Sequence, residues 1–376
     1  MTFKDLNLTT SLLQALHKKG YLEPTPIQEQ CIPHVLEGRD LFGGAQTGTG
    51  KTAAFALPLI QIIAAKKSAQ THSSIKALIL APTRELALQI NDCIKAYGHG
   101  SGIKHTVIFG GVSQFHQVKD LRRGMDILVA TPGRLLDLVQ QGYIKLNAVE
   151  HLVLDEADRM LDMGFIHDIK KIIAKLPAKK QTLFFSATLT PEIKKLSHTL
   201  LHDPVLVSVA PVSSSPDLID QSIYYVKKEN KKLLLRHLLK GTDIEHVLVF
   251  TRTKHGADKV AKDLNSNGIN ADAIHGNKSQ GAREKAMRGF KNKTIRVLVA
   301  TDIASRGIDV RELSHVINYE IPEQAETYVH RIGRTGRAGS QGKAFSFCAS
   351  EERSYMKSIS KLINKKINVV EKHPFA

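Results

Sequence analysis

The sequence predicts an α/β protein of two tandem domains, each a mostly parallel sheet flanked by helices. At 376 residues the chain is too long for one ordinary hydrophobic core and suits two domains. Short apolar runs alternate with helical patterns in both halves, which is typical of βα units in a parallel sheet. Between the halves, residues 210–217 are rich in Pro and Ser and lack apolar periodicity, which indicates a linker.

We therefore expect an N-terminal domain at 1–208, a linker at 209–218 and a C-terminal domain at 219–376. The strands expected in the first half are 76–80, 105–109, 126–130, 151–154 and 181–185. Those expected in the second half are 222–226, 246–250, 271–274, 296–300, 315–318 and 344–348. The two halves also echo each other, because the Ile-Leu-Val-Ala-Thr run at 127–131 recurs as Val-Leu-Val-Ala-Thr at 297–301.

Composition excludes several classes of protein. The chain has no Trp, and no apolar stretch approaches the roughly 18–20 residues that a membrane span needs. Its first residues carry no basic segment followed by an apolar one, so we expect no secretory signal. Cys31, Cys93 and Cys348 lie far apart, which leaves neither a disulfide framework nor a CxxC metal site. We expect a cytoplasmic protein that does not engage membranes.

The net charge of +17 is shared by both halves. Residues 1–208 hold 24 Lys and Arg against 18 Asp and Glu, and residues 209–376 hold 29 against 18. A basic surface on both domains suits a polyanion that contacts both. Solubility alone remains an alternative explanation of the charge.

A glycine-rich segment provides the strongest chemical signal. It reads Ala45-Gln46-Thr47-Gly48-Thr49-Gly50-Lys51-Thr52, with Ala45 at a position where the strict phosphate-loop pattern has Gly. Glycines let backbone N–H groups surround phosphate oxygens, Lys51 can reach the β- and γ-phosphates, and the Thr52 hydroxyl can hold Mg²⁺. The segment predicts a nucleoside triphosphate site.

An acidic segment a hundred residues later completes this prediction. Asp155 follows the apolar run 151–154, and Glu156 comes directly after it. A carboxylate at this strand end would share Mg²⁺ with Thr52, largely through water, while Glu156 would orient or deprotonate the attacking water. We therefore expect this chain to hydrolyse the triphosphate.

A third segment lies in the second half. His330-Arg331-Ile332-Gly333-Arg334-Thr335-Gly336-Arg337 places arginines at threefold spacing beside glycines, which suits recognition of a charged oxyanion. A surface patch is the alternative. If the domains close on the triphosphate, Arg334 and Arg337 become arginine fingers, and one finger is typically worth about 10³–10⁵ in rate.

With these segments in place, the chain resembles the DEAD-box RNA helicases of superfamily 2 from Phe3 to about Phe347. The resemblance rests on hallmark segments in order: 20–28, 82–87, 110–111, 131–134, 155–158, 186–188, 249–253, Gln280 with Arg283, 301–309 and 330–337. Residues 159–168 look specifically like the bacterial RNA helicase E subgroup. The resemblance implies two RecA-like domains, ATP and Mg²⁺ as cofactors, and RNA as a partner.

The resemblance also implies roles around the nucleotide. Gln28 would read adenine, because a side-chain amide matches N6 and N7 of that base; an ordinary helix-start glutamine is the alternative. Phe3 would lie near the adenine, although a lone Phe is also a usual core residue. Gly307 and Asp309 would face the nucleotide. Asp158, Ser186, Thr188 and His330 would couple ATP to strand separation, whereas Ser186 and Thr188 alone could be helix caps.

The expected RNA contacts are to phosphates and sugars, so they carry little base specificity. They are, in the first domain, Pro82, Thr83, Arg84, Gly110, Gly111, Thr131, Gly133 and Arg134, and in the second, Arg252, Thr253, Gln280, Arg283, Thr301 and Asp302.

The expected function is RNA-stimulated ATP hydrolysis that closes the two domains, with local, non-processive unwinding of short duplexes or remodelling of ribonucleoproteins. An ATP-controlled RNA clamp that seldom unwinds, and a translocating DNA helicase, are the alternatives. We expect a monomer. Ribosome-assembly and RNA-decay proteins are candidate partners.

Overall fold

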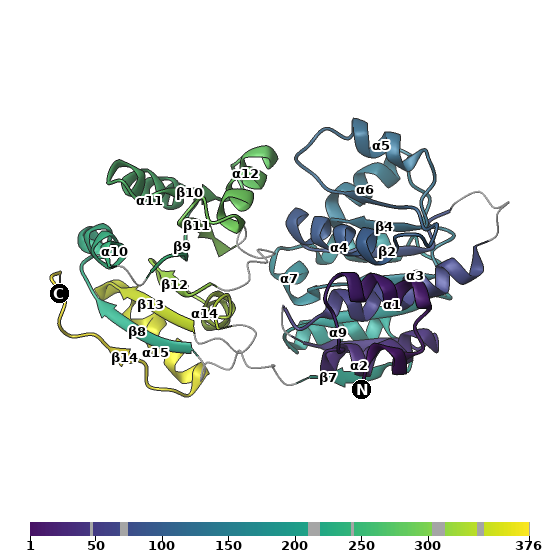
Figure 1. Ribbon diagram of the computed structural model, residues 1–376, viewed down its shortest axis with the longest axis horizontal. Helices are drawn as coiled ribbons and strands as arrows, with labels where there is room; N and C mark the ends of the chain where they lie inside the picture. Colours follow the sequence, from purple (N-terminus) through teal and green to yellow (C-terminus); the bar gives the residue numbers. More distant parts are fainter. Residues whose placement is uncertain are drawn as a thin grey trace. The chain divides into compact units, whose positions relative to one another are not determined.

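The computed structural model describes residues 1–45, 48–67, 74–209, 219–241, 244–302, 313–336 and 342–375. The chain forms two compact units, Met1–Pro211 and Val212–Ala376, which we call the N-terminal and C-terminal domains. In each domain a sheet is covered by helices on both faces (Figure 1).

The N-terminal domain contains a seven-stranded sheet in the order β3-β4-β2-β5-β6-β1-β7, and every paired strand is parallel. The strands are β1 (Leu41–Gly44), β2 (Ala77–Leu80), β3 (His105–Ile108), β4 (Ile127–Ala130), β5 (His151–Leu154), β6 (Gln181–Ser186) and β7 (Val205–Ser208).

The C-terminal domain has its own seven-stranded parallel sheet in the order β10-β11-β9-β12-β13-β8-β14. The strands are β8 (Ile219–Tyr225), β9 (Val247–Thr251), β10 (Ala271–Ile274), β11 (Val297–Thr301), β12 (His315–Asn318), β13 (Gly342–Cys348) and β14 (Asn368–Val369).

The two sheets have the same topology. Each strand of the first sheet has a counterpart in the second sheet whose number is higher by seven, so that β1 corresponds to β8 and β7 to β14. The order of corresponding strands across the two sheets is identical. The echo between 127–131 and 297–301 falls on β4 and β11, which occupy equivalent second positions. The predicted fold of two parallel sheets flanked by helices is therefore confirmed.

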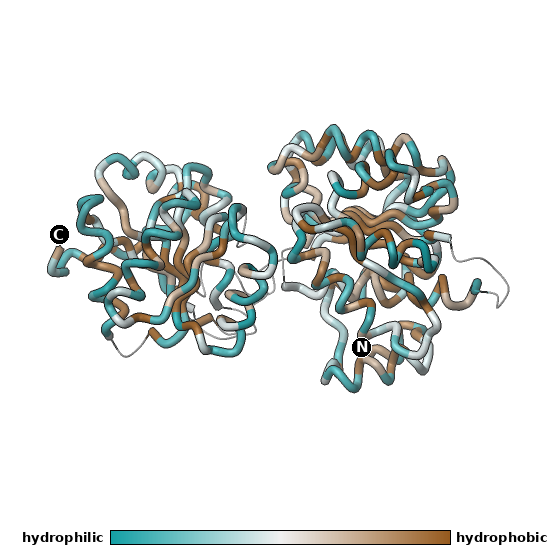
Figure 2. The backbone as a smooth tube through the Cα atoms, turned by 90° about the horizontal axis from the view of Figure 1, so that it is seen from above, coloured by the Kyte–Doolittle hydropathy of each residue, from teal (hydrophilic) through white to brown (hydrophobic). Residues whose placement is uncertain are grey.

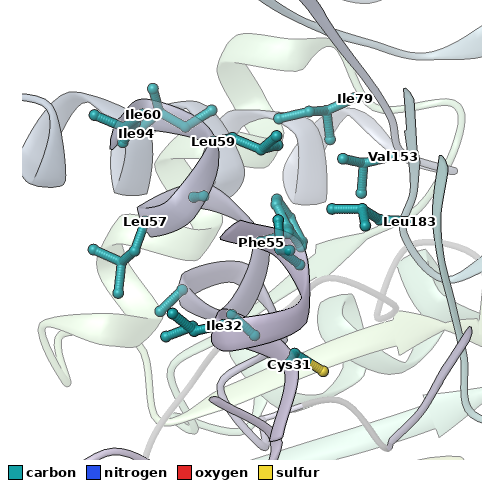
Figure 3. Close-up of a cluster of buried hydrophobic side chains, with 14 of the residues drawn as sticks. Cys31, Ile32, Phe55, Leu57, Leu59, Ile60, Ile79, Ile94, Val153 and Leu183 are labelled. Atoms are coloured by element: carbon teal, nitrogen blue, oxygen red, sulfur yellow. The ribbon is translucent and has the colours of Figure 1, made fainter. Parts of the chain in front are cut away.

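The helices of the N-terminal domain divide between the two faces of its sheet. One core cluster joins alternate strand residues to α1 (Thr10–Lys18), α2 (Pro26–Leu36), α3 (Lys51–Lys66) and α4 (Arg84–Tyr97). Figure 3 shows part of this cluster, where side chains of α2, α3 and α4 surround Ile79, Val153 and Leu183 of the sheet. The other face packs against α5 (Phe115–Leu121), α6 (Pro132–Gln140), α7 (Ala157–Asp162), α8 (Ile166–Ile173) and α9 (Pro191–Leu200).

The C-terminal domain follows the same plan. One face of its sheet packs against α10 (Lys231–Lys240) and α11 (Lys254–Ser266). The other face packs against α12 (Gln280–Lys291), α14 (Ala325–Ile332) and α15 (Arg353–Ile363). In both domains the strands are the most hydrophobic segments and polar residues lie outside (Figure 2).

Within the described part of the chain, no helix is long and apolar enough to cross a membrane.

Candidate ATP and RNA site

The glycine-rich segment lies between β1 and α3, although the sequence pattern did not predict the strand β1. Gly48 and Gly50 have φ angles of +91° and +98°, in the left-handed region that favours glycine. A Cβ on Gly50 would also overlap the Gln28 side chain. The loop therefore needs glycine here, and it delivers the chain to the N-terminus of α3, where free N–H groups and the helix dipole favour anions. Gln46 and Thr47 lie outside the described residues.

Gln28 links α2 to this loop. Its Oε1 accepts a hydrogen bond from the Thr25 backbone N–H at 2.9 Å, and its Nε2 donates to the Gly50 carbonyl oxygen at 3.1 Å. The first contact is that of an ordinary helix-start residue, and the second positions the nucleotide loop. Phe3 is buried in the hydrophobic core of the N-terminal domain, so the structure gives it a packing role.

Lys51 is the first residue of α3, and its side chain is buried. Its Nζ donates a hydrogen bond to the Ala45 carbonyl oxygen at 2.8 Å, across the mouth of the loop. Burial raises the pKa of Asp155, and the positive charge of Lys51 offsets part of that rise. The ammonium group thus lies between the phosphate-binding loop and the acidic strand end.

Asp155 follows β5 and is only 2% exposed. Its Oδ1 has no hydrogen-bond partner among the described residues, and burial raises the pKa of its carboxyl group to about 6. A buried carboxylate oxygen without a donor fits a divalent cation, which prefers oxygen ligands. Thr52, the second residue of α3, can offer its hydroxyl oxygen. These two residues fit Mg²⁺.

Glu156 has a strained backbone and a charged partner. Its φ and ψ are both +54°, a left-handed conformation that is uncommon for a residue other than glycine and is concentrated at functional sites. Its Oε2 forms a buried ion pair with Arg159 Nη1 at 2.5 Å. Sequence reasoning missed this role of Arg159, although the spacing of three residues places both side chains on one face of α7.

Asp158 is the centre of a network with Thr188. Its Oδ2 accepts hydrogen bonds from the backbone N–H groups of Ala187 and Thr188, both at 3.0 Å, and from Thr188 Oγ1 at 3.2 Å. Ser186 Oγ donates to the Thr188 carbonyl oxygen at 2.8 Å. Neither hydroxyl caps α9, whose N-cap is Thr190. Three of the four expected coupling residues therefore meet within one domain, while His330 lies on α14 of the other.

The expected RNA contacts of the N-terminal domain follow β2, β3 and β4, which are neighbours at one side of the sheet. The nucleotide residues follow β1, β5 and β6, which are neighbours on the other side. Because parallel strands end at the same edge, both groups lie at the carboxyl edge of the sheet, where α/β proteins bind ligands.

Two contacts organise the RNA half of this edge. Arg134 Nη2 donates to the Val112 carbonyl oxygen at 3.0 Å, which joins the loop after β4 to the Gly110–Gly111 loop after β3. Gly111 has a φ of +74°, and a Cβ there would overlap the guanidinium group of Arg84. The eight predicted residues all follow the carboxyl ends of these three neighbouring strands: Pro82, Thr83, Arg84, Gly110, Gly111, Thr131, Gly133 and Arg134.

The expected RNA residues of the C-terminal domain follow the equivalent strands β9, β10 and β11. Thr253 caps α11 by accepting a hydrogen bond from the Gly256 N–H at 3.0 Å. The Arg252 backbone N–H donates to Glu320 Oε2 at 2.7 Å, which fixes the loop after β9. Gln280 and Arg283 lie in the first turn of α12, after β10, and Thr301 ends β11.

Arg331 is a buried organising residue that sequence reasoning did not single out. Its Nε and Nη2 bind the two carboxylate oxygens of Asp302 at 2.5 and 2.7 Å. Its Nη1 donates to the Glu320 carbonyl oxygen at 2.7 Å, and its guanidinium lies 5.0 Å from the centre of the Phe250 ring. The carboxylate of Asp302, expected at the RNA, is therefore occupied by Arg331. Arg334 is buried just after α14, whereas Gly307, Asp309 and Arg337 lie outside the described residues.

Comparison with known proteins agrees with this geometry. The chain matches the DEAD/DEAH box helicase family over residues 25–196 and the helicase conserved C-terminal domain over residues 230–339. It is 45% identical over 364 residues to the ATP-dependent RNA helicase CshA of Limosilactobacillus reuteri, covering 96% of this chain and 72% of that protein. The chain belongs to the DEAD-box RNA helicases.

Other DEAD-box relatives extend the match. RNA helicase CrhR of Synechocystis is 44% identical over 369 residues, covering 98% of this chain and 74% of the relative. The structure of Saccharomyces cerevisiae Dbp5 bound to RNA and ADP BeF3 aligns with a TM-score of 0.86 at 29% identity, covering 98% and 95% of the two chains. This likeness confirms the RecA-like fold of both domains.

The family assignment confirms an ATP-dependent RNA helicase that binds RNA. The narrower resemblance to the RNA helicase E subgroup receives no support, because these bacterial relatives carry the names CshA and CrhR. The segment behind that expectation, 159–168, begins with Arg159, whose side chain holds Glu156. At least one residue of this segment therefore serves a structural contact.

Proposed function

We propose that this helicase uses RNA-stimulated ATP hydrolysis to close its two domains and thereby unwinds short RNA duplexes locally, without translocation. The observation that carries this proposal is the repeated topology. In each domain, the residues that we expect to contact RNA follow the same three neighbouring strands of the sheet. Two matching half-sites on two separate domains suit a single strand that must be held by both.

Within the N-terminal domain, the loop from Ala45 to Thr52 would hold the ATP phosphates, and Gln28 would recognise adenine. Lys51 would leave the Ala45 carbonyl oxygen for the β- and γ-phosphates. Bound Mg²⁺, held by Thr52 and Asp155 largely through water, would neutralise phosphate charge. Glu156, whose carboxylate is fixed by Arg159, would orient the attacking water.

The C-terminal domain would complete the reaction. We propose that Arg334 and Arg337 stabilise charge on the γ-phosphate when the domains close, with Gly307 and Asp309 facing the nucleotide. The buried Arg331 would hold the segment that carries Arg334, because it lies three residues earlier and is anchored to Asp302 and Glu320. His330 would then meet the Asp158 and Thr188 network, which links the two activities.

The RNA contacts would act on the backbone of one strand. Residues after β2, β3 and β4 would hold one part of the strand and residues after β9, β10 and β11 the next. Because these groups bind phosphates and sugars, affinity should depend little on sequence. Closure would force the strand into a shape that a duplex does not allow, so the complementary strand would be released. Hydrolysis would reopen the domains.

Strand displacement tests this proposal directly. A short RNA duplex should separate in the presence of ATP, and a long duplex of the same composition should not. A non-hydrolysable ATP analogue should retain the protein on RNA without turnover. ATP-dependent retention on RNA with no displacement of the short duplex would contradict unwinding and favour the clamp. Displacement of long duplexes would contradict the non-processive mechanism.

A further inference from the structure

Helix α5 presents an exposed aromatic ring close to the expected RNA contacts. Phe115, its first residue, is 67% exposed. The His116 ring lies edge-on to it, with 5.3 Å between ring centres. Phe115 follows Gly111 by four residues, so the two lie within about 14 Å of extended chain. A large apolar ring is therefore mostly open to solvent at this place.

The helix that carries Phe115 is fixed to the Gly110–Gly111 loop. The buried Gln117 amide accepts a hydrogen bond from the Phe109 N–H and donates one to the Phe109 carbonyl oxygen, both at 3.1 Å. Phe109 immediately precedes Gly110. The Gln114 amide also donates to Gln141 Oε1, after α6, at 2.8 Å. These hydrogen bonds hold the helix that carries the exposed ring in place. Less conformational entropy is therefore lost when a ligand binds to the ring.

The exposed face of α5 is basic. His116 and Lys119 are exposed on α5, and Arg122 and Arg123 are exposed directly after its last residue. Asp120 forms an ion pair with Arg123 at 3.2 Å. Arg122 also lies over the Tyr143 ring, 5.9 Å from its centre. An aromatic ring with cations at helical spacing combines a surface for a base with a surface for phosphates.

We propose that Phe115 stacks on an unpaired nucleobase of the RNA strand that continues past the Gly110–Gly111 loop, while Lys119 and Arg122 bind phosphates of the same strand. This inference rests on the proposed RNA half-site after β2, β3 and β4, with which the α5 surface is continuous. This contact is to the face of a base, whereas the other expected contacts are to the phosphates and sugars of the RNA backbone. Stacking tolerates any base, so the added affinity is not sequence-specific.

The test compares a single-stranded oligouridine with a strand of the same length made of abasic residues. Affinities are measured by fluorescence anisotropy with a non-hydrolysable ATP analogue. Phe115→Ala should weaken oligouridine binding about 5- to 10-fold and leave the weaker binding of the abasic strand unchanged. Phe115→Trp should retain or improve oligouridine binding, whereas Phe115→Leu should behave as the alanine variant.

Leu206→Ala is the matched control. Leu206 is 75% exposed and lies on β7, at the edge of the same sheet opposite to β3, so its removal should change neither affinity. If Phe115→Ala bound oligouridine as tightly as the unsubstituted protein, the inference would be wrong. The exposed ring would then suit contact with a protein partner. Equal losses on both strands would also overturn the inference. The proposed function is judged separately, by RNA-stimulated ATP hydrolysis in the unsubstituted protein.

Discussion

The side-chain amide of Gln28 donates a hydrogen bond to the carbonyl oxygen of Gly50, the residue just before α3, at 3.1 Å. Its oxygen accepts from the backbone N–H of Thr25, which starts α2. One side chain therefore ties the first turn of α2 to the last residue of the phosphate-binding loop. The residue that we propose to recognise adenine therefore also fixes the geometry of the loop.

Gln28→Ala should remove both contacts. Because one hydrogen bond contributes about 1 kcal/mol, we expect ATP affinity to fall about 10-fold and the preference for ATP over GTP to narrow. Equilibrium binding of labelled ATP and GTP measures both. Gln61→Ala is the matched control, since Gln61 also bonds two backbone groups, of Thr9 and Asn7, away from the loop. An unchanged preference would refute adenine reading by Gln28.

Lys51→Ala should remove most ATP turnover. Without the ammonium group, charge on the β- and γ-phosphates loses its main protein partner in this domain, and we expect a loss of about 10²–10³ in rate. Steady-state hydrolysis at saturating RNA measures it. Lys66→Ala, at the exposed C-terminal end of α3, should keep full activity. Undiminished RNA-stimulated hydrolysis by Lys51→Ala would argue against the phosphate-loop assignment.

Glu156→Gln should separate binding from chemistry. The amide oxygen can still accept a hydrogen bond from Arg159, so the strained turn should persist, but the charge that activates water is lost. We expect ATP-dependent RNA binding to remain and turnover to fall at least about 100-fold. Glu192→Gln, in the exposed first turn of α9, serves as the control. Normal hydrolysis would rule out the role of Glu156.

Asp302→Ala should destabilise the C-terminal domain. Arg331 is 1% exposed, and loss of its bidentate partner would leave a buried charge, at a cost of about 3 kcal/mol in the free energy of unfolding. Denaturant unfolding measures this. Glu323→Ala breaks the exposed pair with Arg252 and should cost less than about 1 kcal/mol. Equal small losses would contradict a stabilising role of the Asp302–Arg331 pair in this domain.

Two buried histidines, His151 and His246, and the half-buried His105 predict acid sensitivity. Burial lowers the pKa of His105, His151 and His246, so the unfolded chain takes up these protons at higher pH than the folded protein. The stability they contribute is fully present above about pH 6.5 and is lost as pH falls below that value. The unfolding midpoint, measured from about pH 7.5 to pH 5, should therefore decrease.

His246→Gln should flatten this dependence, because its ring is packed against Phe290 and donates to the Phe290 carbonyl oxygen. His167→Gln changes an exposed ring and should leave the slope as it is. A midpoint that does not move over this pH range would refute the argument.

Apolar pattern predicted most of the sheet. The predicted strands 151–154, 271–274 and 315–318 coincide with β5, β10 and β12, because each is a short apolar run between polar turns. Three strands were missed. β1 ends in Gly43 and Gly44, residues that strands disfavour, and β7 and β14 are short edge strands whose residues are largely exposed. Pairing with neighbouring strands, rather than the local sequence, gives these three segments their strand conformation.

Motifs predicted which residues gather at the carboxyl edges, but not the side chains that hold them. The Arg331 contacts with Asp302 and Glu320 join helix α14 to the ends of two strands, so only the folded domain brings these residues together. Likewise, the contact of Gln28 with Gly50 crosses from one helix to another. Sequence spacing alone does not report contacts of this kind.

The most direct test of the account is steady-state ATP hydrolysis without nucleic acid, with single-stranded RNA and with DNA of the same sequence, at one stated salt concentration because phosphate contacts are salt-sensitive. We expect RNA to stimulate ATP hydrolysis strongly and DNA to stimulate it little. Equal stimulation by DNA would contradict an RNA helicase and favour a DNA helicase. No stimulation by either would contradict coupling between the ATP residues and the RNA residues.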